Sequence, residues 1–487
     1  MRGARRLALA LAAALPAVLP LTPASGGEAV RDAAEIQARI DAASPGATIV
    51  VEPGVYRGHL VVDRAVTLRG EGRAVIDGGG EGSVITITGD GAVVEGLEVR
   101  GSGAGPVGAP AGIRVEADGV LVRGNVVRDA YLGISAYGAE GLKVVGNRIA
   151  GRARATVGDD AHAMAPAEHP DDPSAADGGD LRGDGISLWD VEGALVRDNV
   201  VEQVRDGVYL SYGSEILVDR NVVRGSRYAI HSMFAKDLTV VECRFEANLS
   251  GAVMMYGGPV LLLRNEIRDS TSPSTGIGVL LKDVAGADVV ENVVVGNRVG
   301  IQVDGPLGTA GVELRVRGNT VALNRFGVAL YPSAQVTFSR NSFVENAVQV
   351  VAKGSGGGRN STWYDEGLGN LRSDYRGYDL TGEGLGDVPY VGGGAVERLL
   401  VRAPVLEALA SGPALQLLRA VEERWVERRP IVEDPLPLMS PVSPPLASGP
   451  RGALAPGVLG SGGLALTALA LGVLWTARRR TGGLAHA

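Results

Sequence analysis

A pattern of 22 residues returns along the middle of the chain. One track of this repeat is mostly polar and holds Asn199, Asn221, Cys243 and Asn265. A second track with the same spacing holds the small residues Gly185, Gly207, Ala229 and Gly251. A fixed period of this length is typical of solenoids, in which each repeat forms one coil and contacts only its neighbours. Equivalent positions of successive coils then stack into columns, so residues distant in sequence become neighbours.

The composition favours a solenoid built from strands. The chain has 72 glycines among 487 residues, few aromatic residues and recurrent valine runs, which suit short strands joined by tight turns. The segments 48–51, 53–56 and 66–70 resemble the start of pectin-lyase-type proteins. We therefore expect an all-β fold, a right-handed parallel β-helix over residues 27–352. A helix over 33–43 would cap its first coil, an insertion loop would cover 152–181, and Gly- and Asp-rich capping loops would cover 353–394.

Both ends of the chain are apolar. Residues 1–26 have the pattern of a secretory signal peptide, with early arginines, an apolar core and small residues before the cleavage zone. Residues 454–475 are long enough for one membrane span, and arginines follow at once in a tail over 476–487. We expect a periplasmic protein that is exported by the signal peptide and anchored to the inner membrane by its C-terminus. The alternative for the C-terminus is a processed sorting tail.

The asparagines of the first track have a structural explanation. An Asn at a turn tolerates left-handed backbone, and stacked copies can pair amide to amide along the axis. Outside the regular stretch the same track continues through Asn125, Asn147, Asn292, Asn319 and Asn341. We expect this ladder to be structural. Cys243, the single cysteine, occupies one of its positions, and we interpret it as a buried free thiol rather than a metal ligand.

Strand alternation places a possible metal site on the outside of the coils. In the strands that follow the second track, alternate residues point outward. One outward column is then Ser187, Tyr209, His231 and Val253, and the next is Trp189, Ser211, Met233 and Met255. His231, Met233 and Met255 converge on one patch, and an imidazole with two thioethers is a soft set that suits Cu(I). The alternative is that these residues only pack beneath a loop or a partner.

The same strands resemble the NosD family. The runs 183–189, 204–208, 227–234 and 253–256 are similar to that family, as are 363–365, 374–390, 430–435 and 437–441 in the same order. The resemblance implies a periplasmic role in copper-site maturation of nitrous oxide reductase. It implies four partners: the ATPase and membrane subunits of an ABC transporter, a copper chaperone and the reductase itself. It also implies transient Cu(I) binding at His231, Met233 and Met255.

Residues 395–445 switch to leucines at helical spacing and then to a Pro-rich strap. With the resemblance in view, we expect this segment to dock the chain onto its transporter. The candidate docking residues are Trp189, Tyr209, Leu438 and Met439.

Two other function classes stay open. The same fold hosts polysaccharide lyases, hydrolases and uronan epimerases, but the outward columns do not show the converging carboxylates that a hydrolase needs. A passive surface solenoid is the second alternative.

The sequence also argues against some functions. Because the net charge is −8 and the sequence has no basic patch, we do not expect nucleic-acid binding. Asp379, Glu383 and Asp387 could bind Ca²⁺, but a turn network is the favoured interpretation. No phosphate-binding loop is present, so any ATP-driven step belongs to a partner.

Overall fold

The computed structural model describes residues 30–152, 182–305, 312–354, 358–394, 417–418, 421 and 430–441. The predicted signal peptide (1–26), nearly all of the insertion loop (152–181) and most of the leucine-rich part of 395–445 lie outside these residues. The predicted span (454–475) and the tail (476–487) lie outside them as well. Among the helices that are described, none has the length and apolarity needed to cross a membrane.

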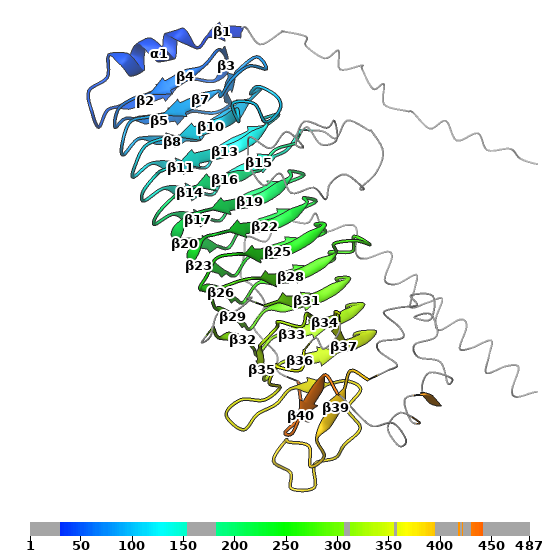
Figure 1. Ribbon diagram of the computed structural model, residues 1–487. Helices are drawn as coiled ribbons and strands as arrows, with labels where there is room; N and C mark the ends of the chain where they lie inside the picture. The colour runs from blue at the N-terminus through cyan, green and yellow to red at the C-terminus, as the bar shows by residue number, and fades with distance from the viewer. Residues whose placement is uncertain are drawn as a thin grey trace, which may run out of the picture.

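The chain winds into a stack of coils, each of which contributes one strand to each of three parallel sheets, and Figure 1 shows the stack from α1 to β39 and β40. Sheet A contains β1 (Val30–Asp32), β3 (Gly54–Arg57), β6 (Ala74–Asp77), β9 (Glu98–Arg100), β12 (Val126–Arg128), β15 (Arg148–Ala150), β18 (Val200–Glu202), β21 (Val222–Arg224), β24 (Arg244–Glu246), β27 (Glu266–Arg268), β30 (Val293–Val295), β33 (Thr320–Ala322), β36 (Ser342–Val344) and β38 (Leu371–Arg372).

Sheet B contains β2 (Thr48–Val51), β5 (Thr67–Gly70), β8 (Val93–Glu95), β11 (Leu121–Arg123), β14 (Lys143–Val145), β17 (Leu195–Arg197), β20 (Ser214–Asp219), β23 (Lys236–Val241), β26 (Val260–Leu263), β29 (Ala287–Val290), β32 (Leu314–Arg317) and β35 (Thr337–Ser339). Sheet C contains β4 (Leu60–Val62), β7 (Ile85–Ile87), β10 (Ala111–Val115), β13 (Leu132–Tyr137), β16 (Ile186–Trp189), β19 (Asp206–Ser211), β22 (Tyr228–Met233), β25 (Ser250–Met255), β28 (Ile277–Lys282), β31 (Val299–Asp304), β34 (Phe326–Leu330) and β37 (Val348–Ala352).

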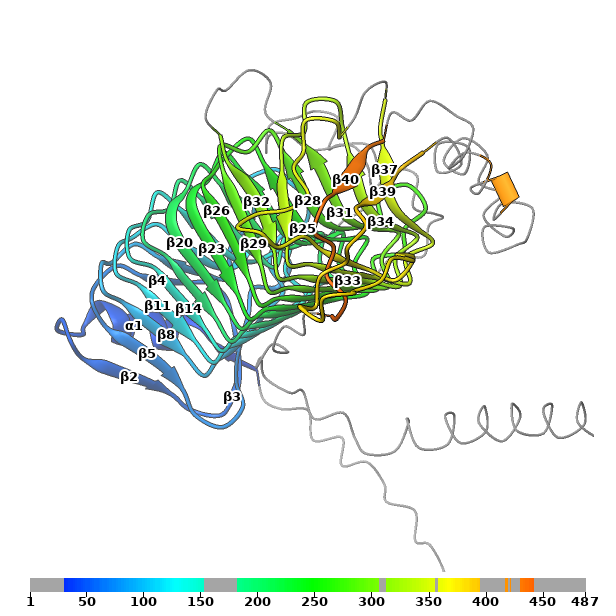
Figure 2. The ribbon, with the colours of Figure 1, turned by 90° about the horizontal axis from the view of Figure 1, so that it is seen from below.

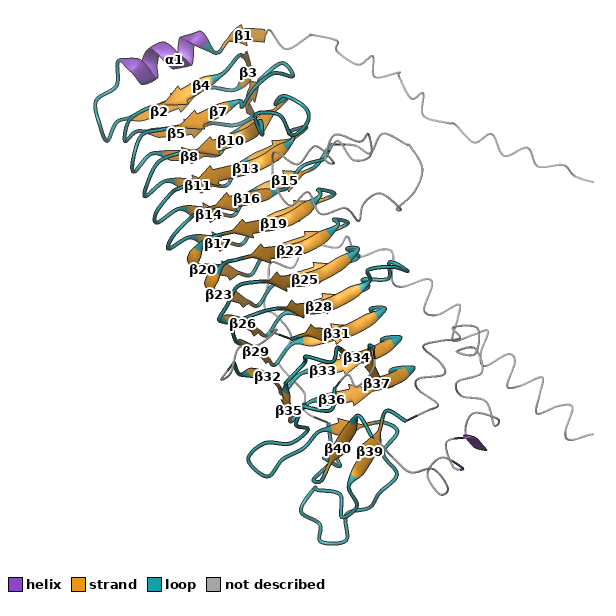
Figure 3. Cartoon of the chain, viewed as in Figure 1, coloured by secondary structure: helices purple, strands orange, loops and turns teal. Residues whose placement is uncertain are grey.

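This arrangement is the predicted right-handed parallel β-helix, and strands and loops make up nearly all of it (Figure 3). Within each sheet the strands pair in parallel with the strand one coil away, so equivalent residues stack. Because side chains alternate along a strand, one set from every strand points inward, and these apolar side chains form one continuous core along the axis. The 22-residue period follows from this geometry, since each circuit has nearly the same length.

A short helix closes the N-terminal end of the core. It is α1 (Ala34–Asp41), at the place predicted from the sequence, and its apolar face consists of Ile36 and Ile40. Both side chains are buried against the first coil, including residues of the strands β2 and β4. The helix therefore covers apolar side chains that would otherwise face water at the open end of the stack.

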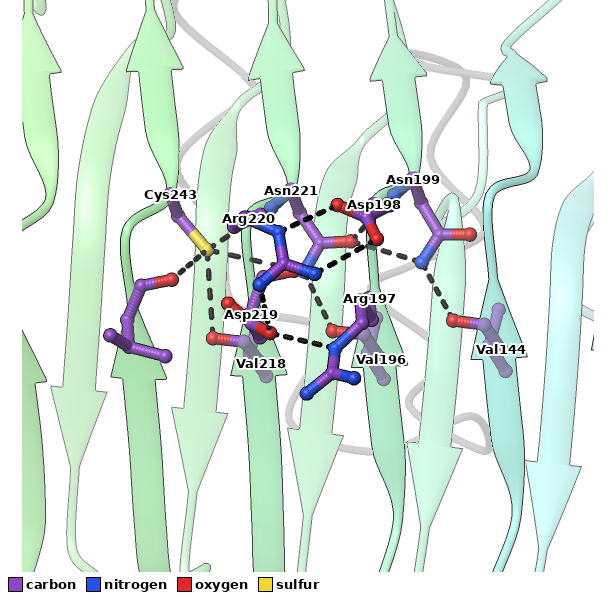
Figure 4. Close-up of polar contacts among 11 residues, drawn as sticks. Val144, Val196, Arg197, Asp198, Asn199, Val218, Asp219, Arg220, Asn221 and Cys243 are labelled. Carbon is purple, nitrogen blue, oxygen red and sulfur yellow. Dashed lines mark hydrogen bonds and ion pairs between the residues drawn. The ribbon is translucent and has the colours of Figure 1, made fainter. Parts of the chain in front are cut away.

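The asparagine ladder is confirmed and runs along one corner of the coils (Figure 4). The backbone N–H and the side-chain amide of Asn199 both donate to Oδ1 of Asn221, at 3.0 and 2.9 Å. The same amide also donates to the carbonyl of Val144 at 2.8 Å. At Cys243 the Sγ atom takes the acceptor's place and lies 3.4 Å from the backbone nitrogen of Asn221. The thiol is fully buried, as expected.

A second ladder was not predicted from the sequence. It runs parallel to the first, at the start of the sheet C strands, and its members are Ser226, Asn248, Ser270, Asn297, Asn324 and Asn346. Where the residue in the next coil is an asparagine, the bond has the same form: the backbone N–H donates to the side-chain oxygen of that asparagine. Among the described residues, the hydroxyl of Ser270 has no hydrogen-bond partner, so the ladder is interrupted between Asn248 and Ser270. The pattern is hard to see in the sequence because two of the six positions are serines and the spacing changes between 22 and 27 residues.

A late segment of the chain closes the C-terminal end. The strands β39 (Tyr390–Gly392) and β40 (Val432–Asp434) form an antiparallel pair at this end of the stack (Figure 2). Oδ2 of Asp434 accepts from the backbone N–H of Asn370 at 2.8 Å, so a carboxylate takes the place of the next ladder asparagine. The same oxygen accepts from Nη1 of Arg372 at 2.7 Å, and neither residue is exposed. The rings of Trp363 and Tyr390 pack against that guanidinium.

Asp379 and Asp387, two of the three residues considered for Ca²⁺ binding, are part of a turn network. The carboxylate of Asp379 accepts from the backbone N–H groups of Gly382 and Gly384, at 2.7 and 2.8 Å. Oδ2 of Asp387 accepts from the backbone N–H of Leu380. These bonds hold the carboxylate oxygens within the loop, which is the arrangement favoured from the sequence.

Candidate functional site

The two predicted outward columns lie on the outer face of sheet C. In the register of the sheet, Tyr209 pairs with His231 and His231 with Val253. In the next column Ser211 pairs with Met233, and Met233 with Met255. The columns are therefore as predicted, but the face is more enclosed than an outward column suggests. His231 is 5% exposed and Met233 7% exposed, while Met255 is partly exposed.

A buried carboxylate holds the imidazole of His231. Nδ1 of His231 lies 2.9 Å from Oδ2 of Asp206, which begins the neighbouring strand β19. Because a carboxylate only accepts, Nδ1 carries the proton and donates it to this bond, and the lone pair of the neutral ring is on Nε2. Nε2 makes no hydrogen bond to any residue that the structure describes. Metal-binding histidines are commonly oriented in this way by a carboxylate on the other ring nitrogen.

Arg227 neutralises the charge of Asp206. Its Nε and Nη2 donate to the two carboxylate oxygens at 2.8 and 2.6 Å. Burial alone would raise the pKa of Asp206. The charge of Arg227 and the hydrogen bonds from His231 and Arg227 outweigh that effect and hold the pKa well below its ordinary value. The carboxylate is therefore ionised at neutral pH and accepts the hydrogen bond from the His231 ring.

The preceding coil repeats the same pair. Asp184 accepts two bonds from Arg205, both at 2.9 Å, and the charge of Asp184 raises the pKa of Arg205. Asp184 and Asp206 are 22 residues apart, as are Arg205 and Arg227. The sequence analysis missed these four residues, although their period is the one that revealed the coils. Asp184, Arg205 and Arg227 lie just before strands of sheet C and Asp206 is the first residue of β19, so none of the four belongs to the two outward columns considered from the sequence.

Aromatic rings surround the imidazole. The rings of Tyr209 and Tyr228 lie 5.2 and 5.0 Å from that of His231. The hydroxyl of Tyr209 donates to Sδ of Met233 at 3.9 Å, a weak bond in which a Lewis acid such as Cu(I) could take the place of the hydroxyl. Burial raises the pKa of Tyr209 and that of Tyr228, so both hydroxyls stay neutral and neither competes as an anion. The rings enclose the patch and restrict water around His231 and Met233.

The ligand chemistry of the patch is soft. Within residues 30–152, 182–305 and the later described segments, no three His, Cys, Asp or Glu side chains are grouped to hold a metal ion. Burial raises the pKa of the Cys243 thiol to about 12, so it does not supply a thiolate. One imidazole and two thioethers, carried by the adjacent strands β22 and β25, thus remain the candidate donors. Such a set favours Cu(I) over hard ions or Zn²⁺.

The four predicted docking residues lie in two separate regions. Trp189 and Tyr209 are on sheet C, where Trp189 is partly exposed and Tyr209 is buried at 8% exposure. Tyr209 thus lines the patch and offers little surface to a partner. Leu438 is held at the C-terminal end by a bond from its backbone N–H to the carbonyl of Asn370, and Met439 next to it is 38% exposed.

Comparison with known proteins agrees with the resemblance. A family model described as "Periplasmic copper-binding protein (NosD)" matches residues 168–377, which include the whole patch. A "Probable ABC transporter binding protein NosD" of Pseudomonas aeruginosa is 31% identical over 79% of this chain and 86% of its own length. A protein of the same description from Stutzerimonas stutzeri is 28% identical over 79% and 85%.

Two solved structures are similar to much of the chain at low sequence identity. A PL6 alginate lyase complex with trisaccharide covers 68% of this chain and 81% of its own, with 14% identity and a TM-score of 0.47. The A-module of the mannuronan C-5 epimerase AlgE4 from Azotobacter vinelandii covers 69% and 96%, with 15% identity and a TM-score of 0.40. Likeness at this level says nothing about activity. From the extent of its similarity to the curated relatives, the chain belongs to the NosD family.

Proposed function

We propose that this chain is an extracytoplasmic accessory protein for copper-site maturation of nitrous oxide reductase. It acts with an ABC transporter as a docking scaffold and holds Cu(I) transiently on the outer face of sheet C. The family description as periplasmic and copper-binding supports this proposal, as do relatives named for binding an ABC transporter. The observation that carries it is the Asp206–His231 bond, which orients the imidazole through Nδ1 and leaves Nε2 available on the face of sheet C that also carries Met233 and Met255.

Cu(I) is cargo in this proposal. Nε2 of His231 and the sulfur atoms of Met233 and Met255 would hold it, and three neutral soft ligands leave one coordination position for the donor or acceptor protein. The strands β22 and β25 are paired on both edges, so the ligands are held on rigid backbone. The Asp206–Arg227 pair sets the orientation of His231 while adding no net charge to the patch.

The enzyme alternative is less well supported. A uronan lyase needs cationic side chains that can neutralise the substrate's carboxylate. Arg205 and Arg227 lie in the two coils around the patch, but each already donates two hydrogen bonds to a buried aspartate, Asp184 and Asp206 respectively. Neither guanidinium group is therefore available to neutralise the carboxylate of a substrate.

A Cu(I) competition titration of the purified full-length chain tests the proposal. We expect stoichiometric binding that is lost in the variant His231→Ala/Met233→Ala/Met255→Ala. The matched control is His59→Ala/Met439→Ala, which removes an exposed histidine and an exposed methionine far from the patch. Equal binding by wild type and the triple variant would overturn the assignment of the ligands. Absence of binding by the wild type would leave the docking role without copper handling.

A further inference from the structure

A row of aromatic rings runs along the edge of the proposed copper patch. Tyr212, Phe234 and Tyr256 each follow by one residue the column that contains Met233 and Met255. The rings of Tyr212 and Phe234 stack at 4.9 Å, and those of Phe234 and Tyr256 at 5.3 Å. Trp189 extends the row at 5.4 Å from Tyr212. We call these four residues the aromatic row; it spans about 15 Å along the axis at one strand spacing per coil.

The row is exposed at a place where the fold does not require large side chains. Tyr212 is 47% exposed and Phe234 is 38% exposed. Tyr212, Phe234 and Tyr256 have φ values of 57°, 57° and 58°, in the left-handed region that is costly for bulky residues. In other coils the equivalent turn position holds the small or polar residues Gly138, Asp190 and Asp283, for which this conformation is easier. Strained, exposed aromatic rings in successive coils indicate a function at the surface.

The surroundings of the row are acidic. Within three residues of a ring of the row lie four exposed acidic side chains, Asp190, Glu192, Glu215 and Asp237. Two bases lie at the row: Lys236, which is exposed, and Lys282, which is partly exposed and lies over the ring of Tyr256. An apolar centre with an acidic rim complements a protein surface with an apolar centre and a basic rim. It would repel an anionic polysaccharide or an anionic membrane surface.

The stacking of the rings also argues against a sugar ligand. A pyranose packs against the face of an aromatic ring, but here the faces of Tyr212, Phe234 and Tyr256 are turned toward one another along the axis. Beyond Tyr256, the ammonium group of Lys282 lies 5.3 Å from the ring centroid and covers the last face. The row therefore presents ring edges, which suit contact with apolar side chains of a protein.

We propose that the aromatic row is the docking surface for the protein that exchanges Cu(I) with the patch, a copper chaperone whose own surface has an apolar centre and a basic rim. This inference rests on the proposed function, because it places the partner next to Met255, the partly exposed member of the ligand set. A partner seated on the row would have its copper site beside the open coordination position. The row thus determines where the metal can be transferred.

The test is binding of the full-length chain to the copper chaperone of the nitrous oxide reductase system, in its apo and Cu(I)-loaded forms. We expect the variant Tyr212→Asn/Phe234→Asn/Tyr256→Asn to weaken binding at least tenfold. Asn tolerates the left-handed backbone, so the variant should fold. The matched control Tyr364→Asn/Tyr378→Asn removes two exposed tyrosines elsewhere and should leave affinity unchanged. Glu215→Lys/Asp237→Lys should slow association at least fivefold and reduce its dependence on salt.

The outcomes separate this inference from the proposed function. Unchanged chaperone affinity in the triple Asn variant would overturn the docking surface, even if Cu(I) titration of the patch succeeds. Loss of binding to the reductase or to anionic phosphatidylglycerol vesicles, with chaperone binding intact, would show that another partner uses the row and would also overturn the proposal. Apo-chaperone binding that is retained in the His231/Met233/Met255 variant, which lacks Cu(I) binding, and lost in the triple Asn variant supports the docking surface independently of copper.

Discussion

Cys243 occupies a position of the asparagine ladder where every other described coil from Asn125 to Asn370 has an amide. The backbone N–H of Asn221 lies 3.4 Å from its sulfur, whereas the ladder asparagines accept the equivalent bond at 2.8 to 3.1 Å. The side-chain amide of Asn221 is 3.9 Å from the same sulfur. Sulfur is a weak acceptor, so this link is the weakest along the corner.

Restoring the amide should therefore stabilise the protein. We expect Cys243→Asn to raise the free energy of unfolding by about 1 kcal/mol, since it strengthens two buried hydrogen bonds of ordinary net value. Urea denaturation of wild type and variant measures the difference. Cys243→Ala serves as the control, because it removes the acceptor altogether and should destabilise. A Cys243→Asn variant less stable than wild type would contradict the view that the ladder is limited by its acceptor.

The same residue predicts a pH dependence. Burial raises the pKa of the Cys243 thiol to about 12, whereas a thiol of an unfolded chain has a pKa of about 8.5. The stabilising contribution is thus fully present below about pH 8.5 and is lost as the pH rises toward 12. The stability advantage of Cys243→Asn over wild type should widen by up to about 1.4 kcal/mol per pH unit in this window. Urea denaturation at pH 7.5, 9 and 10.5 tests this, and a constant difference would refute it.

Asp206 acts on copper only through His231, which makes it a positioning residue. We expect Asp206→Leu/Arg227→Met, which replaces the buried pair by apolar side chains, to weaken Cu(I) binding by about tenfold or more. Asp206→Asn/Arg227→Met keeps an acceptor for Nδ1 of His231 and should retain most of the affinity. Competition titration compares the two variants. Equal affinities would mean that the orientation of the imidazole does not matter.

At the scale of elements, the strand β40 closes the C-terminal end of the stack, as α1 closes the N-terminal end. Asp434 ends the ladder and also pairs with the fully buried Arg372. We expect Asp434→Asn to cost about 3 to 5 kcal/mol, because it keeps the ladder acceptor but leaves a buried guanidinium without its counter-charge. Arg372→Met in the same chain should recover much of the loss. Thermal unfolding followed by circular dichroism tests both, and a mild effect of Asp434→Asn alone would show that the aromatic rings suffice.

The elements also show what sequence could and could not predict. The coils, their register and the first asparagine ladder follow from a period of 22 residues, because regular hydrogen bonding between coils forces equivalent residues into columns. The partnership of Asp434 with Asn370 has no period, since it joins positions 64 residues apart across a change of structure. The Asp206–His231 bond was equally hidden: the two residues lie in different coils and at different places along their strands.

At the scale of the whole molecule, the stack behaves as a one-dimensional array in which each coil contacts its neighbours. We expect deletion of residues 320–341 to leave a folded protein that is one coil shorter. Asn319 then precedes Ser342, and both ladders keep their order. Deletion of residues 320–330 is the control: it removes half a coil and should abolish cooperative unfolding. Circular dichroism melts distinguish the two, and similar melts would mean that the columns do not determine the fold.

The bond between Asp434 and Asn370 has a further consequence for how the molecule comes into being. A chain synthesised or exported from its N-terminus can lay down coil upon coil, each on the template of the last. The final coil is incomplete until residue 434 has emerged. Until then, Arg372 lacks the ion pair that it forms with Asp434. A nascent chain that stops before residue 434 therefore has an open end that carries an uncompensated charge, unlike a chain that includes β40.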